Sequence, residues 1–217
     1  MQGRDYWNKR FEDEEKIWGE TPSISATYAA KIFKENEART ILVPGCGYGR
    51  NSLFLAKEGF TVTAFDFSSV ALKTAREIAT NMHIDNVEYY EGNALDEKGY
   101  KGVYEGIYVS NLLHLFLKDD REILLRNLEK VLCRRGIISL NVFSPEDSSY
   151  GEGELVEENT YYSNDGHFTH YFTQDSLMKD FLNFELLSCE KIREFENHGE
   201  KKEHSHNFLF AAFRKLN

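Results

Sequence analysis

Short β-rich runs alternate with segments of helical period along most of this 217-residue chain. The β-rich runs are residues 40–43, 60–65, 87–90, 107–110 and 137–143. The most regular helical segment follows the second run, with apolar residues Ala71, Ala75, Ile78, Ala79 and Met82 at helical spacing. Alternation of this kind predicts parallel strands joined by right-handed crossovers, so the expected fold is a doubly wound α/β sheet.

Local signals mark where the later elements begin and end. Candidate N-caps stand before three predicted helices: Ser68 or Ser69, Asp119 or Asp120, and Thr173. Gly136 is expected to end the helix before the fifth run. Two final strands, at 184–192 and 206–213, are separated by a polar connection at 193–205, which predicts an antiparallel hairpin at one edge of the sheet.

Composition limits the possible partners. The chain has 26 Lys and Arg and 36 Asp and Glu, so its formal net charge is −10. This charge disfavours electrostatic binding to nucleic acid or to an anionic membrane. The apolar run 208–213 is too short to cross a bilayer, and residues 1–11 lack the apolar core of a secretory signal. The three cysteines show no CxxC pairing. We therefore predict one domain over 1–217 in the reducing cytoplasm.

The sharpest signal is the glycine-rich stretch at 43–51, between the first run and the first helical segment. Gly45, Gly47 and Gly49 form the pattern G-x-G-x-G, which allows a tight turn and close approach of a ligand to the backbone. A dinucleotide fingerprint would place its third glycine at Arg50, and no phosphate-binding G-K-[ST] occurs. The loop therefore predicts a ligand site without a phosphate anchor.

Two further signals follow the second and third runs. Asp66 ends the second run, 19 residues after Gly47, where a carboxylate can accept hydrogen bonds from both ribose hydroxyls of an adenosine group. Residues 91–96 follow the third run and carry an amide, Asn93, that can meet an adenine edge. Because all three signals come at strand ends, they jointly predict an adenosine-binding pocket.

These motifs together resemble the class I (Rossmann-like) S-adenosylmethionine-dependent methyltransferases, and in particular the small-molecule group that includes tellurite-resistance and thiopurine methyltransferases. Their glycine loop tends to be P-G-C-G-x-G, and residues 44–49 here are P-G-C-G-Y-G. The resemblance covers 41–143 and, more loosely, the final hairpin. It implies a mostly parallel seven-stranded sheet of order 3-2-1-4-5-7-6, and S-adenosyl-L-methionine as cofactor.

The resemblance also implies roles for individual residues. The three loop glycines would pack beside the methionyl and ribose parts, Asp66 would hold the ribose, and Phe67 would stack on adenine. Asn93, where the family more commonly has Asp, would meet the adenine rim with Ala94, and the Ser110 carbonyl would meet the methionyl amine. The full predicted cofactor-binding set is Trp18, Pro44, Gly45, Cys46, Gly47, Gly49, Arg50, Asn51, Asp66, Phe67, Ser68, Asn93, Ala94, Leu95 and Ser110.

Methyl transfer from a sulfonium is an in-line displacement that needs alignment more than acid–base groups, and alignment can supply about 7–11 kcal/mol. His114, just after the fourth run, is a candidate general base, with packing at a helix start as its alternative. The fourth run lacks the [DN]-P-P-[YF] sequence of enzymes that methylate nucleic acid bases. We therefore expect a small-molecule acceptor, with neither nucleic acid nor membrane as partner.

Two segments are candidate covers for the site. Residues 1–38 are predicted to form an N-terminal lid that contains Trp18. Residues 144–172 have no Lys or Arg but carry seven acids and several aromatics, which predicts a substrate cover suited to a neutral or cationic acceptor. The alternative is a solvated acidic loop held by its aromatics. The pairs His167/His170 and His204/His206 lack a third ligand, so no metal is predicted.

The predicted function is transfer of a methyl group from S-adenosylmethionine to a small-molecule nucleophile. Two alternatives stay open at this point. A protein that binds the cofactor as a sensor, without turnover, would show the same motifs because methyl transfer has no obligatory catalytic residue. A nicotinamide-dependent oxidoreductase would share the fold, although Arg50 in the third glycine position argues against it.

Overall fold

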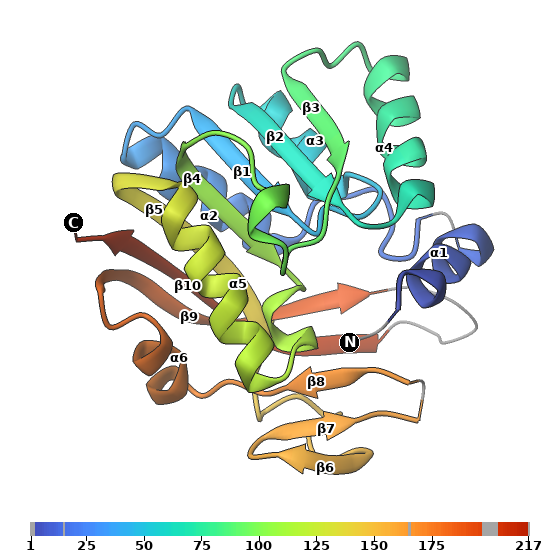
Figure 1. The fold of residues 1–217 in the computed structure, drawn as a ribbon, viewed down its shortest axis with the longest axis vertical. Helices are drawn as coiled ribbons and strands as arrows, with labels where there is room; N and C mark the ends of the chain where they lie inside the picture. Colours follow the sequence, from blue (N-terminus) through green and yellow to red (C-terminus); the bar gives the residue numbers. More distant parts are fainter. Residues whose placement is uncertain (1–2, 15, 165, 197–203, 217) are drawn as a thin grey trace.

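The computed structural model describes residues 3–14, 16–164, 166–196 and 204–216. A twisted seven-stranded sheet runs through the centre of the molecule (Figure 1). Its strands, in spatial order, are β3 (Val87–Glu91), β2 (Thr61–Asp66), β1 (Thr40–Pro44), β4 (Tyr104–Ser110), β5 (Leu132–Phe143), β10 (His204–Lys215) and β9 (Phe184–Glu196). Strands β1–β5 pair in parallel, whereas β10 is antiparallel to both neighbours. Counted within this sheet alone, the order is the expected 3-2-1-4-5-7-6.

Helices cover both faces of the sheet. They are α1 (Arg4–Asp13), α2 (Ile24–Glu35), α3 (Arg50–Lys57), α4 (Ser69–Asn81), α5 (Lys118–Val131) and α6 (Gln174–Asp180), with short 3-10 turns η1 (Glu97–Gly99) and η2 (Leu113–Leu115). Strand β1 shows how the two cores divide. Ile41 and Val43 join the core under α2, α3 and α4, while Leu42 between them joins the core under α5 and α6. The strand is therefore buried on both faces, as a central parallel strand requires.

Two of the three helix caps predicted from the sequence are present in the structure. The Ser68 hydroxyl accepts the Ala71 N–H at 3.2 Å to cap α4, and Thr173 forms a reciprocal capping box with Ser176 at the start of α6. The third expectation was wrong, because α5 begins at Lys118 after Leu117, which gives no side-chain cap. Asp119 and Asp120 lie instead in the first helical turn, where negative charge favours the helix dipole.

Gly136 does not end α5, contrary to expectation. The helix ends at Val131, and β5 begins at the next residue, so that Gly136 lies inside a strand. A Cβ at this position would come within 2.6 Å of Leu132 Cδ1. Close packing at the start of β5 therefore requires the glycine, a tertiary constraint that looks like a helix stop in sequence.

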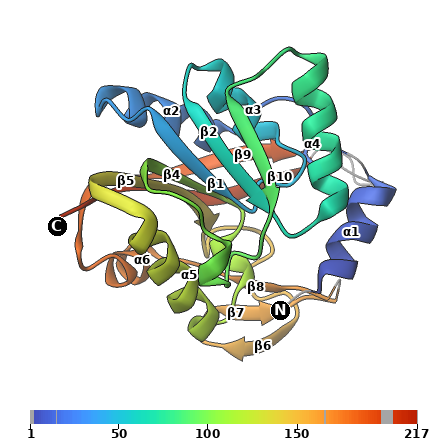
Figure 2. The same ribbon diagram turned by 45° about the horizontal axis from the view of Figure 1, so that its top comes forward.

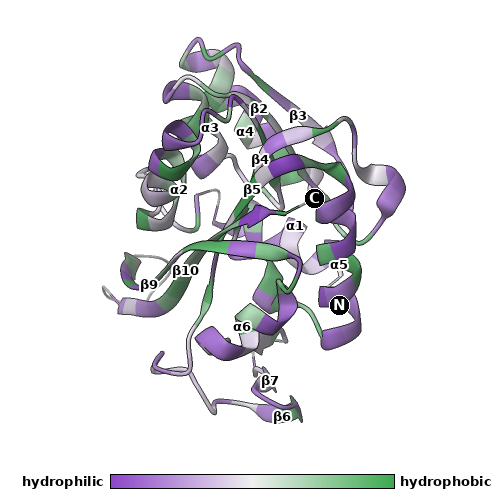
Figure 3. Ribbon diagram, turned by 90° about the vertical axis from the view of Figure 1, so that its left-hand side faces the viewer, coloured by the Kyte–Doolittle hydropathy of each residue, from purple (hydrophilic) through white to green (hydrophobic). Residues whose placement is uncertain are grey.

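The edge hairpin is longer than its apolar runs indicated. Strand β9 continues to Glu196 and β10 begins at His204, so much of the polar connection at 193–205 pairs as strand, and the remaining residues, 197–203, lie outside the described residues. On β9, Ile192 and Glu194 are buried while Arg193 and Phe195 are exposed. The apolar run 208–213 of β10 continues the core between β5 and β9 (Figure 3).

The segment 144–172 folds into a second, three-stranded antiparallel sheet that the sequence did not predict. Its strands are β6 (Glu154–Glu157), β7 (Thr160–Tyr162) and β8 (Phe168–His170), in that order. Both ribbon views place this small sheet beside the carboxyl end of β5, with β8 facing the main body (Figures 1 and 2). Among the described residues, no helix combines the length and apolar character needed to span a membrane.

Candidate cofactor site

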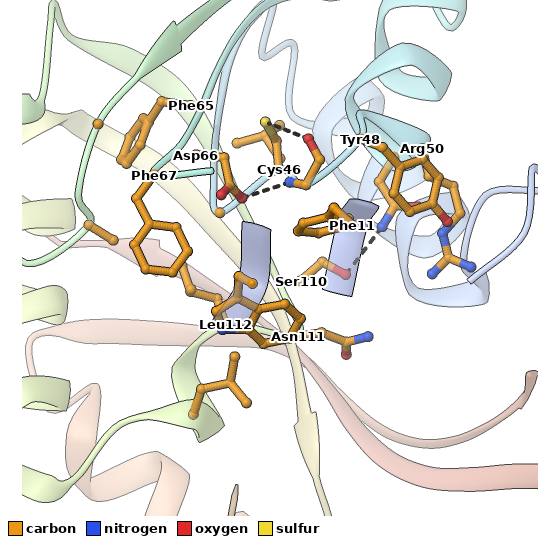
Figure 4. Close-up of a pocket in the computed structure, with 18 of the residues that line it drawn as sticks. Phe11, Cys46, Tyr48, Arg50, Phe65, Asp66, Phe67, Ser110, Asn111 and Leu112 are labelled. Atoms are coloured by element: carbon orange, nitrogen blue, oxygen red, sulfur yellow. Dashed lines mark hydrogen bonds between the residues drawn. The ribbon is translucent and has the colours of Figure 1, made fainter. Parts of the chain in front are cut away.

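A pocket opens at the carboxyl ends of β1, β2, β3 and β4, at the edge where ligands of open α/β sheets bind. Figure 4 shows Asp66 and Phe67 on one side of this pocket and Arg50 on the other, with Phe11 between them. The wall therefore has one carboxylate end, one cationic end and an aromatic middle.

The glycine loop forms the floor. Gly45, Gly47 and Gly49 have φ values of +63°, +54° and +87°, a left-handed region that favours glycine. At position 49 a glycine is also required for steric reasons, because a Cβ there would lie 2.7 Å from the Tyr89 hydroxyl oxygen. The loop thus turns sharply from β1 into α3 and brings bare backbone to the pocket.

Asp66 is held by backbone donors. Its Oδ2 accepts the Gly47 N–H at 2.8 Å and its Oδ1 accepts the Ser68 N–H at 2.9 Å. Burial raises the pKa of Asp66, and these N–H groups oppose that rise by stabilising the charged form. A carboxylate has about four acceptor positions, so two donors leave capacity for hydroxyl groups of a ligand.

The opposite side of the pocket carries donors. Arg50 is the one cationic side chain among the described wall residues, and its Nη1 donates to the Trp18 carbonyl at 2.7 Å. Asn51 donates through Nδ2 to the Ser110 hydroxyl at 3.2 Å. Both residues begin α3, directly after the glycine loop. This end of the pocket therefore suits an anionic group.

Aromatic residues from the N-terminal segment cover the pocket. Trp7 and Phe11 of α1 line it, as does Trp18, whose ring stacks on Tyr48 at a centroid distance of 6.2 Å and an interplanar angle of 11°. Tyr48 also accepts the Trp18 N–H and donates to the Gly19 carbonyl. The proposed lid at 1–38 needs a correction, however, since α2 is a core helix with Phe33 fully buried against the sheet.

The structure brings most of the predicted cofactor residues into one wall: Trp18, Gly45, Cys46, Gly47, Arg50, Asn51, Asp66, Phe67, Asn93, Ala94 and Ser110. Four others are neighbours in sequence but do not line it: Pro44, Gly49, Ser68 and Leu95. Sequence reasoning missed the other wall residues: Trp7, Phe11, Val43, Tyr48, Phe65, Gly92, Asn111, Leu112, Leu115 and Phe116. Val43, Tyr48, Phe65 and Gly92 adjoin predicted residues. The aromatic pair four residues apart on α1 was a further signal, whereas the four residues after β4 have no motif.

His114 is not placed to act as a general base, which corrects the sequence-based candidate. Its side chain is 2 % exposed, does not line the pocket, and packs edge-on against Phe143 at 4.7 Å between ring centroids. Burial, with His167, His206 and His170 nearby, lowers the pKa of His114 to about 3. The alternative of packing at a helix start is the one that the geometry supports.

The insertion 144–172 does not reach this pocket, because none of its described residues lines the wall. Several of its acids contact the protein instead. Glu157 accepts the Lys118 N–H and lies 3.6 Å from Arg121, while Asp147 accepts the Asn207 N–H at 2.7 Å and pairs with His206. No group of three or more potential metal ligands gathers within the described ranges.

Comparison with known proteins relates part of the chain to a known family. Residues 41–136 match the family described as a methyltransferase domain. This segment of the chain is therefore similar to a methyltransferase domain. Two solved structures with a similar fold hold S-adenosylhomocysteine or S-adenosylmethionine. The match spans the glycine loop, Asp66, Asn93 and Ser110, and so includes most of the wall described above.

Two curated relatives match part of the chain. A putative methyltransferase of Geobacillus sp. (strain WCH70) is 26% identical over 136 residues, which cover 62% of this chain and 53% of that protein. An uncharacterized RNA methyltransferase of Protochlamydia amoebophila is 26% identical over 117 residues, covering 52% of this chain and 24% of that protein. The chain thus spans about half or less of the length of these relatives.

Solved structures share the whole fold. The 1,6-didemethyltoxoflavin-N1-methyltransferase of Burkholderia thailandensis, solved with its substrate and S-adenosylhomocysteine, superposes with a TM-score of 0.71 at 18% identity, covering 99% of this chain and 87% of that one. TehB of Haemophilus influenzae superposes with a TM-score of 0.68 at 15% identity, covering 87% and 62%. At these sequence identities, both comparisons show that the chain shares the fold of these proteins.

The residues of the pocket fit S-adenosylmethionine chemically. Asp66 keeps free acceptor positions for ribose hydroxyls, and Phe67 and Ala94 offer apolar surface for an adenine ring. Arg50 and the Asn51 amide are donors suited to the carboxylate of the methionyl part. The two polar ends are separated by an aromatic cover, which matches a ligand with a polar group at each end.

Proposed function

We propose that this protein transfers a methyl group from S-adenosylmethionine to a small-molecule nucleophile. The observation that carries the proposal is the hydrogen bond between the glycine loop and the acid at the end of β2, since Gly47 donates to Asp66 in one pocket wall within the matched family region. When bound, the cofactor supplies an activated methyl group on a sulfonium. The acceptor attacks that methyl in line, and S-adenosylhomocysteine leaves.

The protein's part in this reaction is to bind, orient and exclude water. Asp66 at one end and Arg50 with Asn51 at the other would fix the cofactor along the pocket. Trp7, Phe11 and Trp18 would then shield it from solvent. Holding donor and acceptor in reactive geometry can supply about 7–11 kcal/mol, so the chemistry needs no dedicated base.

The proposed acceptor is neutral and at least partly apolar. Leu112, Leu115 and Phe116 make the wall apolar beyond the end of β4, and the acids of the insertion do not line it. The net charge of −10 opposes a polyanionic acceptor such as nucleic acid. The toxoflavin-type substrate of the Burkholderia enzyme is likewise a small molecule. Three free cysteine thiols support a reducing, cytoplasmic location.

Calorimetric titration with S-adenosylhomocysteine tests the cofactor. One-site binding in the micromolar range or tighter supports the proposal, whereas no heat with either S-adenosylhomocysteine or S-adenosylmethionine at two temperatures contradicts it. A parallel titration with NADH, followed by its fluorescence, checks the oxidoreductase alternative, which saturable binding would favour.

Turnover separates an enzyme from a sensor. The purified protein is incubated with S-adenosylmethionine and a panel of thiols, amines, phenols and halides, and S-adenosylhomocysteine is quantified by chromatography. Product that depends on a neutral acceptor supports the proposed class. Tight cofactor binding without product on any member of the panel would favour the sensor alternative.

A further inference from the structure

A buried carboxylate far from the glycine loop is connected to the pocket by hydrogen bonds. Glu194 lies on β9 of the edge hairpin and is 4 % exposed. Its Oε1 accepts the Ser25 N–H at 3.1 Å and the Ser25 hydroxyl at 3.0 Å. A buried carboxylate is costly unless it is well hydrogen-bonded, so its presence here calls for a role that an apolar residue could not serve.

Three hydroxyl groups continue from Glu194 toward the pocket. The Ser25 hydroxyl lies 2.9 Å from the Tyr108 hydroxyl, which in turn lies 3.0 Å from the Ser23 hydroxyl. All three residues are buried, with the serines at the start of α2 and the tyrosine on β4. We refer to Glu194, Ser25, Tyr108 and Ser23 as the hydroxyl relay.

The hydroxyl relay ends on Asn51, in the pocket wall. The Asn51 Oδ1 accepts the Ser23 N–H at 3.0 Å and the Ser23 hydroxyl at 3.2 Å, so the amide oxygen points away from the pocket. The amide nitrogen, Nδ2, points the other way and donates to the Ser110 hydroxyl, which also lines the pocket. An amide nitrogen has two hydrogens, so one stays available for a ligand.

Glu194 gives the hydroxyl relay its direction. A hydroxyl has one hydrogen, and a charged acceptor attracts it more strongly than a neutral one. With the Ser25 hydrogen on Glu194, the Ser25 oxygen is left to accept from Tyr108. The Ser23 N–H, two residues earlier at the same helix start, donates to Asn51 whichever way the hydroxyl hydrogens turn. Without Glu194, Ser25 loses the acceptor of both its N–H and its hydroxyl, so the start of α2, which carries Ser23 to Asn51, is held less firmly.

We propose that Glu194 is a positioning residue that, through the hydroxyl relay, holds the Asn51 amide with its donor toward the carboxylate of the methionyl part of the cofactor. The inference rests on the proposed function. It assigns that carboxylate to the Arg50 and Asn51 end because Asp66, an acceptor, occupies the other end of the pocket and Arg50 is the one cation among its described wall residues.

Two ligands that differ in the amino-acid part provide the test. S-adenosylhomocysteine carries the methionyl-type carboxylate, whereas 5′-methylthioadenosine keeps the adenosine and thioether and lacks the amino-acid group. Calorimetry gives the dissociation constant of both ligands for wild type, Glu194→Ala and Tyr108→Phe. We expect each variant to weaken S-adenosylhomocysteine binding by about tenfold and 5′-methylthioadenosine binding by less than about threefold.

Two further variants serve as controls. Glu194→Gln keeps an acceptor oxygen. The ratio of its dissociation constants for the two ligands should therefore lie within about threefold of the wild-type ratio, because a neutral acceptor replaces a charged one at a cost below that of a whole hydrogen bond. Glu190→Ala makes the alanine change at an exposed residue four positions earlier on β9, and should leave both constants unchanged. If Glu194→Ala does not fold, Tyr108→Phe still tests the hydroxyl relay, because it removes only one hydroxyl group.

Each outcome decides a different point. An unchanged ratio in Glu194→Ala and Tyr108→Phe, an equal loss for both ligands, or a Gln variant that behaves like Ala overturns the inference and leaves the proposed function standing. Wild-type protein that binds neither ligand overturns the proposed function, and the inference with it. A selective loss for S-adenosylhomocysteine that Gln restores supports both.

Discussion

The Gly47 N–H donates to Asp66 Oδ2 at 2.8 Å, and this hydrogen bond joins the loop after β1 to the end of β2. The two most informative sequence signals are therefore one physical unit. The carboxylate that faces the ligand also holds the loop that forms the floor beneath it, so a change at Asp66 affects both.

Asp66→Ala should weaken S-adenosylhomocysteine binding by about 100-fold. The variant removes the acceptor of two ribose hydroxyls, each worth about 1.5 kcal/mol to a charged partner, and it also frees the Gly47 N–H. Isothermal titration measures the constant. Asp85→Ala, the same change at an exposed position before β3, is the control and should bind as wild type does. Equal affinity of Asp66→Ala and wild type would refute the assigned site.

Gly49→Ala should destabilise the protein more than Gly59→Ala. Both positions have left-handed backbone, which costs a non-glycine residue about 1–2 kcal/mol. At Gly59 a Cβ meets no atom within 4 Å, whereas at Gly49 it would lie 2.7 Å from the Tyr89 hydroxyl oxygen, and overpacking adds about 1–3 kcal/mol. Urea unfolding measures both variants, and equal losses would mean that Tyr89 moves aside freely.

His114→Leu should make the protein less sensitive to acid. Burial holds the folded-state pKa of His114 near 3, below its ordinary value of 6.5, so between these pH values the unfolded chain binds the extra proton. Stability is therefore lost as pH falls through this window, with a slope of up to about 1.4 kcal/mol per pH unit for one group. The leucine variant should lack that contribution in urea unfolding measured from pH 7 to pH 4.

The same variant separates packing from catalysis. Because His114 does not line the pocket, His114→Leu should keep wild-type affinity for S-adenosylhomocysteine and wild-type turnover at pH 7. Its buried Nδ1 has no hydrogen-bond partner in the described part of the chain, so an apolar replacement should cost little. Loss of turnover with intact cofactor binding would restore the general-base hypothesis.

The double variant Glu157→Gln/Glu158→Gln should leave cofactor affinity and the acceptor KM unchanged. Neither acid lines the pocket, and Glu157 instead accepts the Lys118 N–H and pairs with the buried Arg121. The expected effect is a loss of about 1 kcal/mol in the free energy of unfolding, measured in urea. A raised acceptor KM with unchanged stability would show that the insertion contacts a cationic substrate after all.

Features set by nearest neighbours along the chain could be predicted from sequence. The glycine spacing, the acid at the end of β2 and the Ser68 cap each depend on a few consecutive residues, and strand–helix alternation then determines which strand ends meet. That logic gave the doubly wound parallel sheet and most of the pocket floor, whereas the strand order came from the family resemblance.

Features set by docking could not be predicted in the same way. Trp7 and Phe11 reach the pocket because α1 packs against α4, and nothing in their own segment specifies that contact. His114 is buried because β8 packs on η2, while β7 and β8 are three residues each, too short for an alternating pattern to show. Gly136 was misassigned because a close contact with Leu132 has no sequence signature.

The separation of Ser25 from Glu194 has a consequence for synthesis. The two residues that meet at the start of the hydroxyl relay are 169 positions apart in sequence. A ribosome releases the glycine loop, Asp66 and the whole N-terminal cover long before the acid on β9, and domains complete their folding only when the last strands are available. A nascent chain paused before the final hairpin would therefore contain the residues of the pocket floor. It would still lack Glu194, the residue that orients Asn51 at the opposite end of the pocket.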